Sequence, residues 1–322
     1  MSDDPELNAN PIKILLCANN DYAQHLAVTL ASIVINNAND HLEITIAGNI
    51  KEATQRKLHE VLSLNRKSSL TFITLDTIHE ACLDHLSAHD LPTQGDYNIK
   101  GSYSIDVYTR LLLDHIFSPE TERVLYLDSD LVVDGSLRPL WDTDILDYPV
   151  AGVPVPYYDR THLPNLTPGD RYVNSGVLLF NLPAWRSLGC EIKCISFIKN
   201  NQAILRDPDQ DALNAALKGH IFFLSAKWNA FGAYLKALDN EKPNAPSEPP
   251  VVYHFNGANK PWLYLSDPPM KHLYSYYLQR TPWRGSTPPD KTPTNIAWKW
   301  ARRLTPSVCK RAARRLLFRP TL

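Results

Sequence analysis

The chain has few cysteines, and they form no recognisable metal-binding or disulfide pattern. Five cysteines are scattered over 322 residues, an odd number that does not suit a disulfide framework. Cys190 and Cys194 lie four residues apart on a predicted helix, with no second pair to complete a zinc site. We therefore expect reduced thiols and a cytosolic compartment.

The sequence also lacks a long apolar run, and its first residues do not resemble a secretory leader. No apolar stretch approaches the roughly 20 residues that a membrane-spanning helix needs. The segment MSDDPELNANP at the start is acidic and polar, so we expect no signal peptide. With 44% hydrophobic residues, the chain is expected to form one large core, or one core plus an appendage.

Acidic residues are absent from the end of the chain. From Lys291 onward there are nine Lys and Arg and no Asp or Glu, so the rest of the chain carries a formal charge of −10. Two amphipathic helices with basic faces are predicted there, at Asn295–Leu304 and over residues 306–317. Basic helices that contain Trp suit a membrane interface rich in anionic lipid. A nucleic-acid arm and a helix packed on the parent domain are the alternatives.

Strand-like and helix-like segments alternate along the first half of the chain. Strands are predicted at Ile12–Cys17, Leu42–Gly48, Leu70–Leu75 and residues 124–127, and helices at Tyr22–Ile35, Ala53–Leu64 and Ile105–Phe117. This order predicts an α/β fold with a mostly parallel sheet and right-handed crossovers.

A glycine-rich phosphate turn is missing after the first strand. The pattern Gly-x-Gly-x-x-Gly does not follow it, which argues against a dinucleotide site. The polar turn Asn19-Asn20-Asp21 stands there instead. It could cap the next helix, or it could contact a base or ribose.

Two acids follow the predicted buried strand near the middle of the chain. Asp128 and Asp130 come directly after its apolar run, separated by Ser129. Charge at the end of a buried strand is costly unless a cation lies there, and ligands bind at this edge of open α/β sheets. Two carboxylates one residue apart suit a divalent cation that carries a phosphorylated ligand. The alternative is a strand end with solvated Asp side chains, because so short a pattern often occurs by accident.

Two further clusters of polar residues lie at the start of a predicted strand and a predicted helix in the second half of the chain. Asn174 and Ser175 begin the predicted strand Val173–Leu182, where a strand-edge turn is the alternative. Residues 207–211 place three acids and a Gln at the start of a helix, which is more than a cap requires.

A third polar group follows the predicted strand over residues 251–255. This strand contains His254, and Gly257 and Lys260 come after it. A lone His is usually structural, but here a flexible Gly and a cation suited to phosphate lie close by.

Four motifs, LYLDSD, NSGVLLFNL-x-x-W, DQDALN and HFNGANKPW, occur in this order. Together they resemble glycosyltransferase family 8, which includes bacterial lipopolysaccharide galactosyl- and glucosyltransferases and has glycogenin as a relative. The resemblance runs from about Ile12 to Trp262. It implies a GT-A fold, a nucleotide-binding-type sheet flanked by helices, over residues 1–265. A Pro-rich linker (266–294) and the basic tail (295–322) would follow.

The resemblance implies retaining transfer of galactose or glucose from a UDP-sugar to a lipopolysaccharide-type glycan, with a divalent metal, Mn²⁺ or alternatively Mg²⁺. The implied metal ligands are Asp128, Asp130 and His254. The implied donor contacts are Ala18, Asn19, Asp21, Tyr22, Arg110, Asp128, Ser129, Asn174, Ser175, Asp209, Gln210, Gly257 and Lys260. Asp209 and Gln210 would act at the sugar. The family usually has Asp where this chain has Asn19 and Asn where it has Asp21, so specificity for uracil is the weakest part of the resemblance.

An amide is a poor nucleophile beside a carboxylate, which favours front-face attack over a covalent intermediate. Gln210 would then steady the oxocarbenium-like centre while Asp209 holds sugar hydroxyls. An inactive sugar-nucleotide or glycan-binding module is one alternative, although such a module is expected to lose a metal ligand or the DQD run. A haloacid dehalogenase-type phosphohydrolase is another, although its Asp pair normally lies on the first strand.

The expected partners are a UDP-hexose, a glycan or glycolipid acceptor and an anionic membrane surface, with no nucleic acid. We expect a cytoplasmic protein held at the inner face of the cell membrane by its basic tail.

Overall fold

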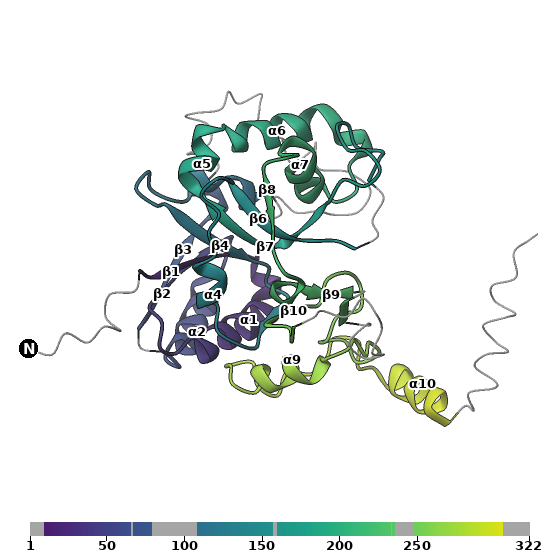
Figure 1. Cartoon of the computed structure of the whole chain (residues 1–322). Coiled ribbons are helices and arrows are strands. Elements are labelled where there is room, and N and C mark those ends of the chain that lie inside the picture. Colours follow the sequence, from purple (N-terminus) through teal and green to yellow (C-terminus); the bar gives the residue numbers. More distant parts are fainter. Residues whose placement is uncertain are drawn as a thin grey trace, which may run out of the picture.

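A seven-stranded sheet forms the centre of the protein, with strand order β3-β2-β1-β4-β7-β6-β8 (Figure 1). The computed structural model describes residues 10–65, 67–78, 108–156, 160–232, 234–235 and 248–304. The strands are β1 (Ile12–Cys17), β2 (Leu42–Ala47), β3 (Ser68–Ile73), β4 (Arg123–Leu127), β6 (Val150–Pro154), β7 (Val173–Asn181) and β8 (Ile221–Phe223).

Most neighbouring strands in this sheet are parallel. β1 runs parallel to β2 and β4, β2 to β3, and β6 to β8, whereas β7 is antiparallel to both β4 and β6. All nine residues of β7 are buried, because helices cover both faces of the sheet. The predicted α/β fold with a mostly parallel sheet is confirmed.

Helices cover the sheet in two layers, each with its own core (Figure 1). α1 (Ala23–Asn36) and α2 (Glu52–Leu62) pack on one face. On the other face lie α5 (Leu182–Ser187), α6 (Cys190–Asn201) and α7 (Pro208–Ala216). The predicted helix that carries Cys190 and Cys194 is α6, and it is separated from α5 at Gly189, which has left-handed backbone (φ 59°).

A second, three-stranded sheet lies beside the carboxyl end of β4. Its strands are β5 (Leu131–Val133), β10 (Val252–His254) and β9 (Ala230–Phe231), and the short helix α4 (Arg138–Trp141) follows β5. β10 is antiparallel to β5, and this register sets His254 opposite Leu131. The pairing brings the end of β10 next to the turn that carries the two acids.

The predicted helix Ile105–Phe117 differs from the structure. Residues 105–107 lie outside the described residues, and the remainder forms two 3₁₀ turns, Thr109–Leu111 and Leu113–His115. The backbone leaves helical geometry at Leu112 (φ −94°, ψ 45°). Arg110, in the first of these turns, is buried near the carboxyl end of β4, where it pairs with Asp128 and Asp209.

The segment predicted as a linker (266–294) contains a packed helix, α9 (Lys271–Leu278). Tyr277 is buried against α1, where its hydroxyl donates to Asp134 and accepts from Asn36. Aromatic burial and these hydrogen bonds make α9 part of the core, so this part of the segment is not a free linker.

The first predicted tail helix is present as α10 (Pro293–Leu304). The second, over residues 306–317, lies outside the described residues. Within the described part of the chain, no helix combines the length and apolar character that crossing a membrane requires.

Candidate active site

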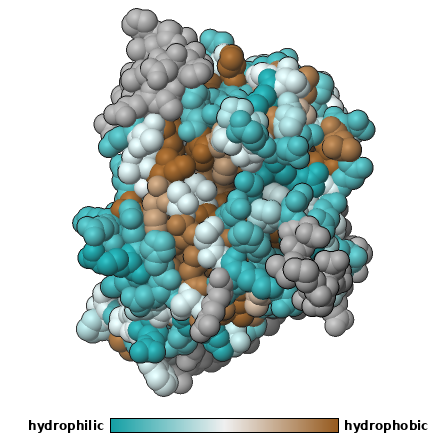
Figure 2. Space-filling model, turned by 90° about the vertical axis from the view of Figure 1, so that its left-hand side faces the viewer, coloured by the Kyte–Doolittle hydropathy of each residue, from teal (hydrophilic) through white to brown (hydrophobic). Residues whose placement is uncertain are grey.

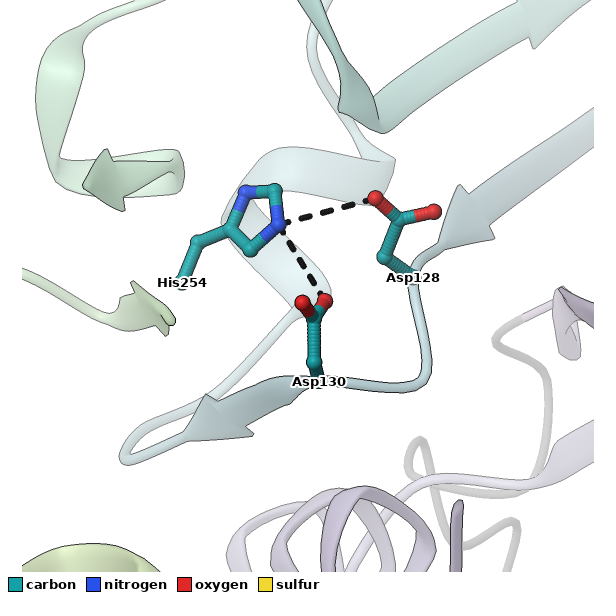
Figure 3. A group of neighbouring side chains, drawn as sticks. All are labelled: Asp128, Asp130 and His254. Atoms are coloured by element: carbon teal, nitrogen blue, oxygen red, sulfur yellow. Dashed lines mark ion pairs between the residues drawn. The ribbon is translucent and has the colours of Figure 1, made fainter. Parts of the chain in front are cut away.

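Asp128, Asp130 and His254 converge at the carboxyl end of β4 (Figure 3). His254 Nε2 lies 3.2 Å from Asp130 Oδ1 and 3.5 Å from Asp128 Oδ2. The three ligand atoms lie within 4.8 Å of one another. We call these three residues the triad. The tertiary fold therefore joins the two predicted strand ends in one cluster.

Neighbouring side chains hold Asp128 and His254 in position. Asp128 Oδ1 accepts a hydrogen bond from the Tyr126 hydroxyl (2.6 Å) and forms an ion pair with Arg110 Nη1 (3.0 Å). His254 Nδ1 contacts an amide oxygen, Asn229 Oδ1, at 2.9 Å. These contacts leave Asp128 Oδ2 and His254 Nε2 facing each other across the site.

Lys260 holds the remaining acid of the triad. Its Nζ forms an ion pair with Asp130 Oδ2 and donates to the Phe255 carbonyl at 2.9 Å. Burial tends to raise the pKa of Asp130, but His254 and Lys260 outweigh it and hold that pKa well below its usual range. Asp130 is therefore ionised, with the ammonium group of Lys260 on one side and the imidazole of His254 on the other.

The absence of a side chain at Gly176 makes room for the triad. A Cβ on Gly176 would lie 2.3 Å from His254 Cε1 and 2.7 Å from Asp128 Oδ2. Only glycine therefore lets β7 pass this close to the triad. Two carboxylate oxygens and one imidazole nitrogen, close to one another, suit a divalent cation.

Asp209 and Gln210 lie in the first turn of α7, beside the triad. Asp209 Oδ2 is 3.2 Å from Arg110 Nε, and this buried oxygen accepts no hydrogen bond from any of the described residues. Burial raises the pKa of Asp209, and Arg110 opposes that rise. Gln210 Oε1 accepts from Asn174 Nδ2 (2.8 Å) and from the Ser175 backbone N–H (3.0 Å).

One cavity of about 630 Å³ joins the triad to these polar side chains. The predicted residues that line it are Asp128, Asp130, His254, Arg110, Asn174, Ser175, Asp209, Gln210, Gly257 and Lys260. The structure therefore brings the predicted metal ligands and most of the predicted donor contacts into one place.

The remaining predicted donor contacts gather at the end of β1. Asn19 Oδ1 accepts the backbone N–H groups of Asp21 (3.1 Å) and Tyr22 (3.2 Å), so Asn19 caps the turn as one reading of the sequence predicted. Ala18 lies in the same turn, and the Ser129 hydroxyl donates to the Cys17 carbonyl at 2.8 Å. A contact between this turn and a base stays a prediction.

An aromatic group connects that turn to Lys260. His25 stacks on Trp262 with ring centroids 3.6 Å apart, and the edge of Tyr22 also meets Trp262. Lys260 Nζ lies 5.3 Å from the Trp262 ring centroid, and the Tyr274 hydroxyl of α9 contacts His25 Nδ1 at 2.7 Å. Burial lowers the pKa of His25 to about 4, so its ring is neutral near neutral pH.

Three residues at the site were not predicted from the sequence. They are Asn229, Gly176 and Tyr172, whose hydroxyl accepts a hydrogen bond from Gln210 Nε2 at 3.1 Å. Gly176 carried a usable signal, because a glycine inside an apolar strand often marks close approach by another group. Asn229 and Tyr172 carried none, since a single amide or phenol outside any motif acquires a role only through its neighbours in the fold.

A larger hollow lies at the opposite end of the strands. It measures about 960 Å³ and is lined in part by Lys13, Arg123 and Trp141, where β1 and β4 begin. Leu146, which also lines it, is 74% exposed. Figure 2 shows an apolar band on one face of the molecule. Size does not make this hollow the functional site, because among the described residues the triad is the cluster suited to a metal.

Comparison with known sequences identifies the family. The sequence profile of glycosyl transferase family 8 matches residues 13–266, most of the chain. The chain belongs to glycosyltransferase family 8. The predicted family is thereby confirmed, and the protein is related to lipopolysaccharide glucosyl- and galactosyltransferases.

Curated relatives span most of the chain. General stress protein A of Bacillus subtilis is 29% identical over 283 residues, covering 84% of this chain and 94% of that protein. The lipopolysaccharide 1,2-glucosyltransferase of Escherichia coli K12 is 25% identical over 280 residues, covering 84% and 78%.

Solved structures of glycosyltransferases share the fold, which confirms the predicted GT-A fold. The galactosyltransferase LgtC, solved in complex with donor and acceptor sugar analogs, superimposes with a TM-score of 0.67 at 22% identity. The match covers 87% of this chain and 98% of that chain. The haloacid dehalogenase alternative is not retained, because the family and the fold are those of a glycosyltransferase.

Proposed function

We propose that this family 8 glycosyltransferase moves galactose or glucose from a UDP-sugar to a lipopolysaccharide-type glycan with retention of configuration. The observation that carries the proposal is the single cavity of about 630 Å³, which holds the triad at one side and Asp209 and Gln210 at the other. A metal-bound diphosphate beside the triad would set the hexose against these two residues.

Asp128, Asp130 and His254 would hold a divalent metal, Mn²⁺ by preference because one ligand is an imidazole, with Mg²⁺ as the alternative. When bound, that metal neutralises the charge that develops on the leaving diphosphate. Arg110 and Lys260 lie beside the triad carboxylates and add two more positive charges where the diphosphate would bind.

Asp209 and Gln210 differ in what they can offer a sugar. Asp209 Oδ2 is buried and forms an ion pair with Arg110 Nε, but it accepts no hydrogen bond from the described residues, and a hexose hydroxyl could donate to it. Gln210 Oε1 already accepts two hydrogen bonds, which occupy both of its lone pairs. This occupancy supports front-face attack, in which Gln210 steadies the positive centre instead of bonding to it.

The turn at the end of β1 would bind the nucleoside. Ala18, Asn19, Asp21 and Tyr22 lie there, and Tyr22 is linked through Trp262 to Lys260. Base and diphosphate would therefore be bound by adjoining parts of one surface.

Release of UDP from a panel of UDP-sugars, measured with an LPS-type glycan acceptor, tests the function. We expect turnover with UDP-galactose or UDP-glucose that EDTA abolishes and Mn²⁺ restores. Asp130→Asn should lack this turnover. Asp142→Asn should retain it, because Asp142 is an exposed acid at the hollow where β1 and β4 begin. Tight binding of UDP-sugar without turnover on any glycan would favour the inactive binding module instead.

We also propose that the basic tail binds the anionic inner face of the cell membrane. In α10, Ala297, Trp298, Trp300 and Ala301 are exposed, which supports an interfacial helix. Lys299 is not on this surface, because its Nζ pairs with Asp267 and donates to the Tyr264 carbonyl. The charge for lipid binding would then come from Arg302 and from basic residues after Leu304.

Sedimentation with vesicles of phosphatidylglycerol tests the tail. Replacing both exposed tryptophans, Trp298→Ser and Trp300→Ser, should reduce binding while UDP release to a soluble acceptor continues. The matched control is Tyr276→Ser, another exposed aromatic outside α10. Unchanged sedimentation of the double variant would reject α10 as the membrane contact.

A further inference from the structure

A continuous chain of hydrogen bonds connects the sugar end of the cavity to the metal end. We call it the polar chain. Its members, in order, are Asp211, Tyr172, Gln210, Asn174, Asn229 and His254. The links measure 2.6, 3.1, 2.8, 2.8 and 2.9 Å, and all six residues are buried.

Two backbone N–H groups, which can only donate, fix the orientation of the side-chain amides of Gln210 and Asn174. The Ser175 backbone N–H donates to Gln210 Oε1 at 3.0 Å, so the oxygen of Gln210 must face β7. The Gly176 backbone N–H donates to Asn174 Oδ1 at 3.0 Å, which fixes Asn174 in the same way. A flip of either amide would set two donors against each other.

These two amides determine the direction of every other link. With its oxygen toward β7, Gln210 uses Nε2 to donate to Tyr172, whose hydroxyl donates in turn to the Asp211 carboxylate. Asn174 Oδ1 also accepts from the Nδ2 of Asn229 (2.8 Å). The oxygen of Asn229 is therefore the atom that faces the imidazole.

We infer that Asn229 fixes the tautomer of His254 and is a positioning residue for the metal site. Asn229 Oδ1 lies 2.9 Å from His254 Nδ1 and can only accept, so Nδ1 must carry a hydrogen. The nitrogen that remains for coordination is Nε2, which faces Asp128 and Asp130. Through Asn174 and Asn229, the orientation of the Gln210 amide therefore determines which nitrogen of His254 is left to bind a metal, namely Nε2.

Because Asp128 and Asp130 lie beside the ring, the tautomer of His254 has to be fixed from the other side. Without Asn229, a neutral His254 would place its single hydrogen on Nε2, because Asp130 Oδ1 lies 3.2 Å away as an acceptor. That tautomer would block the nitrogen which faces the site. Asn229 removes this competition by accepting on the opposite side of the ring.

The tautomer can be measured without any metal. Long-range ¹H–¹⁵N spectra of ¹⁵N-histidine-labelled protein, at a pH where the ring is neutral, report which ring nitrogen carries the hydrogen, with His254→Gln used for assignment. We expect the hydrogen on Nδ1 in the wild type and on Nε2 in Asn229→Leu. A wild-type ring with its hydrogen on Nε2, or an unchanged tautomer in Asn229→Leu, would overturn the inference.

The effect on the site is measured as binding of Mn²⁺ alone, and this part rests on the proposed function. Loss of such an outer partner typically weakens metal binding by about 10- to 100-fold, which we expect for Asn229→Leu. Asn229→Asp keeps an oxygen opposite Nδ1 and should keep the hydrogen on that nitrogen. Its second oxygen cannot donate to Asn174 Oδ1, so we expect only partial recovery of the Mn²⁺ affinity. Failure of Asn229→Asp to restore the tautomer would contradict the inference.

A matched control separates this role from a general loss of stability. Asn65 is another buried Asn, which donates to the Asn37 carbonyl at 3.0 Å far from the triad. Asn65→Leu should lower Tm without changing the His254 tautomer or the Mn²⁺ affinity. A changed tautomer in Asn65→Leu would contradict a specific role of Asn229. If wild-type protein binds no Mn²⁺ but carries the hydrogen on Nδ1, the proposed metal fails and the tautomer assignment stands.

Discussion

Gly176→Ala is the sharpest test of how the site is built. The added methyl carbon would lie 2.3 Å from His254 Cε1, whereas carbon atoms in contact normally stay about 3.5 to 4.0 Å apart. The imidazole would therefore have to move by about 1.2 Å or more, since the methyl carbon is fixed to the backbone of β7. Metal–ligand distances tolerate only about 0.2 Å, so such a shift should remove His254 from the coordination sphere.

The expected result is a loss of activity out of proportion to the loss of stability. A misplacement of about 1 Å can reduce turnover by about 100-fold, whereas overpacking costs about 1 to 3 kcal/mol of folding free energy. We expect Gly176→Ala to lower kcat/KM for UDP release by at least that factor and to weaken Mn²⁺ binding. Titration calorimetry, UDP release and a thermal melt measure the three quantities.

Gly152→Ala is the matched control for this prediction. Its Cβ would also be crowded, 3.0 Å from Val173 Cβ and 3.1 Å from Leu178 Cδ2, but these neighbours are apolar and do not belong to the triad. The control should lose stability and retain Mn²⁺ affinity. Equal Mn²⁺ binding and turnover in the two variants would refute the argument from steric contact with His254.

The remaining predictions concern the sugar, the acid stability and the C-terminal helix. Asp209→Asn should lower kcat by about 10- to 100-fold, with UDP affinity in titrations unchanged, because a charged hydrogen bond to the hexose is lost. Gln210→Glu should yield no stable glycosyl-enzyme in a mass spectrum if attack is front-face. His25 has a pKa of about 4 when folded and about 6.5 when unfolded, so it lowers stability as pH falls through this window. Melts of His25→Gln should show a weaker decline there. Tyr277→Phe, which loses its bonds to Asp134 and Asn36, should cost about 1 to 3 kcal/mol in urea unfolding.

Sequence patterns predicted some elements well and others poorly, for physical reasons. β4 was predictable because a strand covered on both faces is a continuous apolar run, and Val124–Leu127 is such a run. The segment around Arg110 was predicted as one helix from its spacing of apolar residues. Tertiary contacts decided otherwise, since Arg110 meets Asp128 and Asp209 and the chain breaks at Leu112.

The composition of residues 266–294 led to a wrong prediction for part of that segment. Prolines predicted a linker, yet α9 packs Tyr274 and Tyr277 into the core beside α1. A short helix rich in Tyr has no strong sequence signature, and its stability depends on partners such as Asn36 and Asp134, which lie far away in the sequence.

The sequence by itself determined the fold class, the family resemblance and the chemical types at the site. Local periodicity and four motifs are properties of neighbouring residues, so they can be read without coordinates. Only the tertiary structure decided which of those residues act together. The antiparallel pairing of β10 with β5 brings His254 to Asp130, and the path of β7 brings Gly176 against the ring. The direction of the polar chain was also undetermined by sequence, because it depends on backbone N–H groups of β7 meeting side chains from other elements.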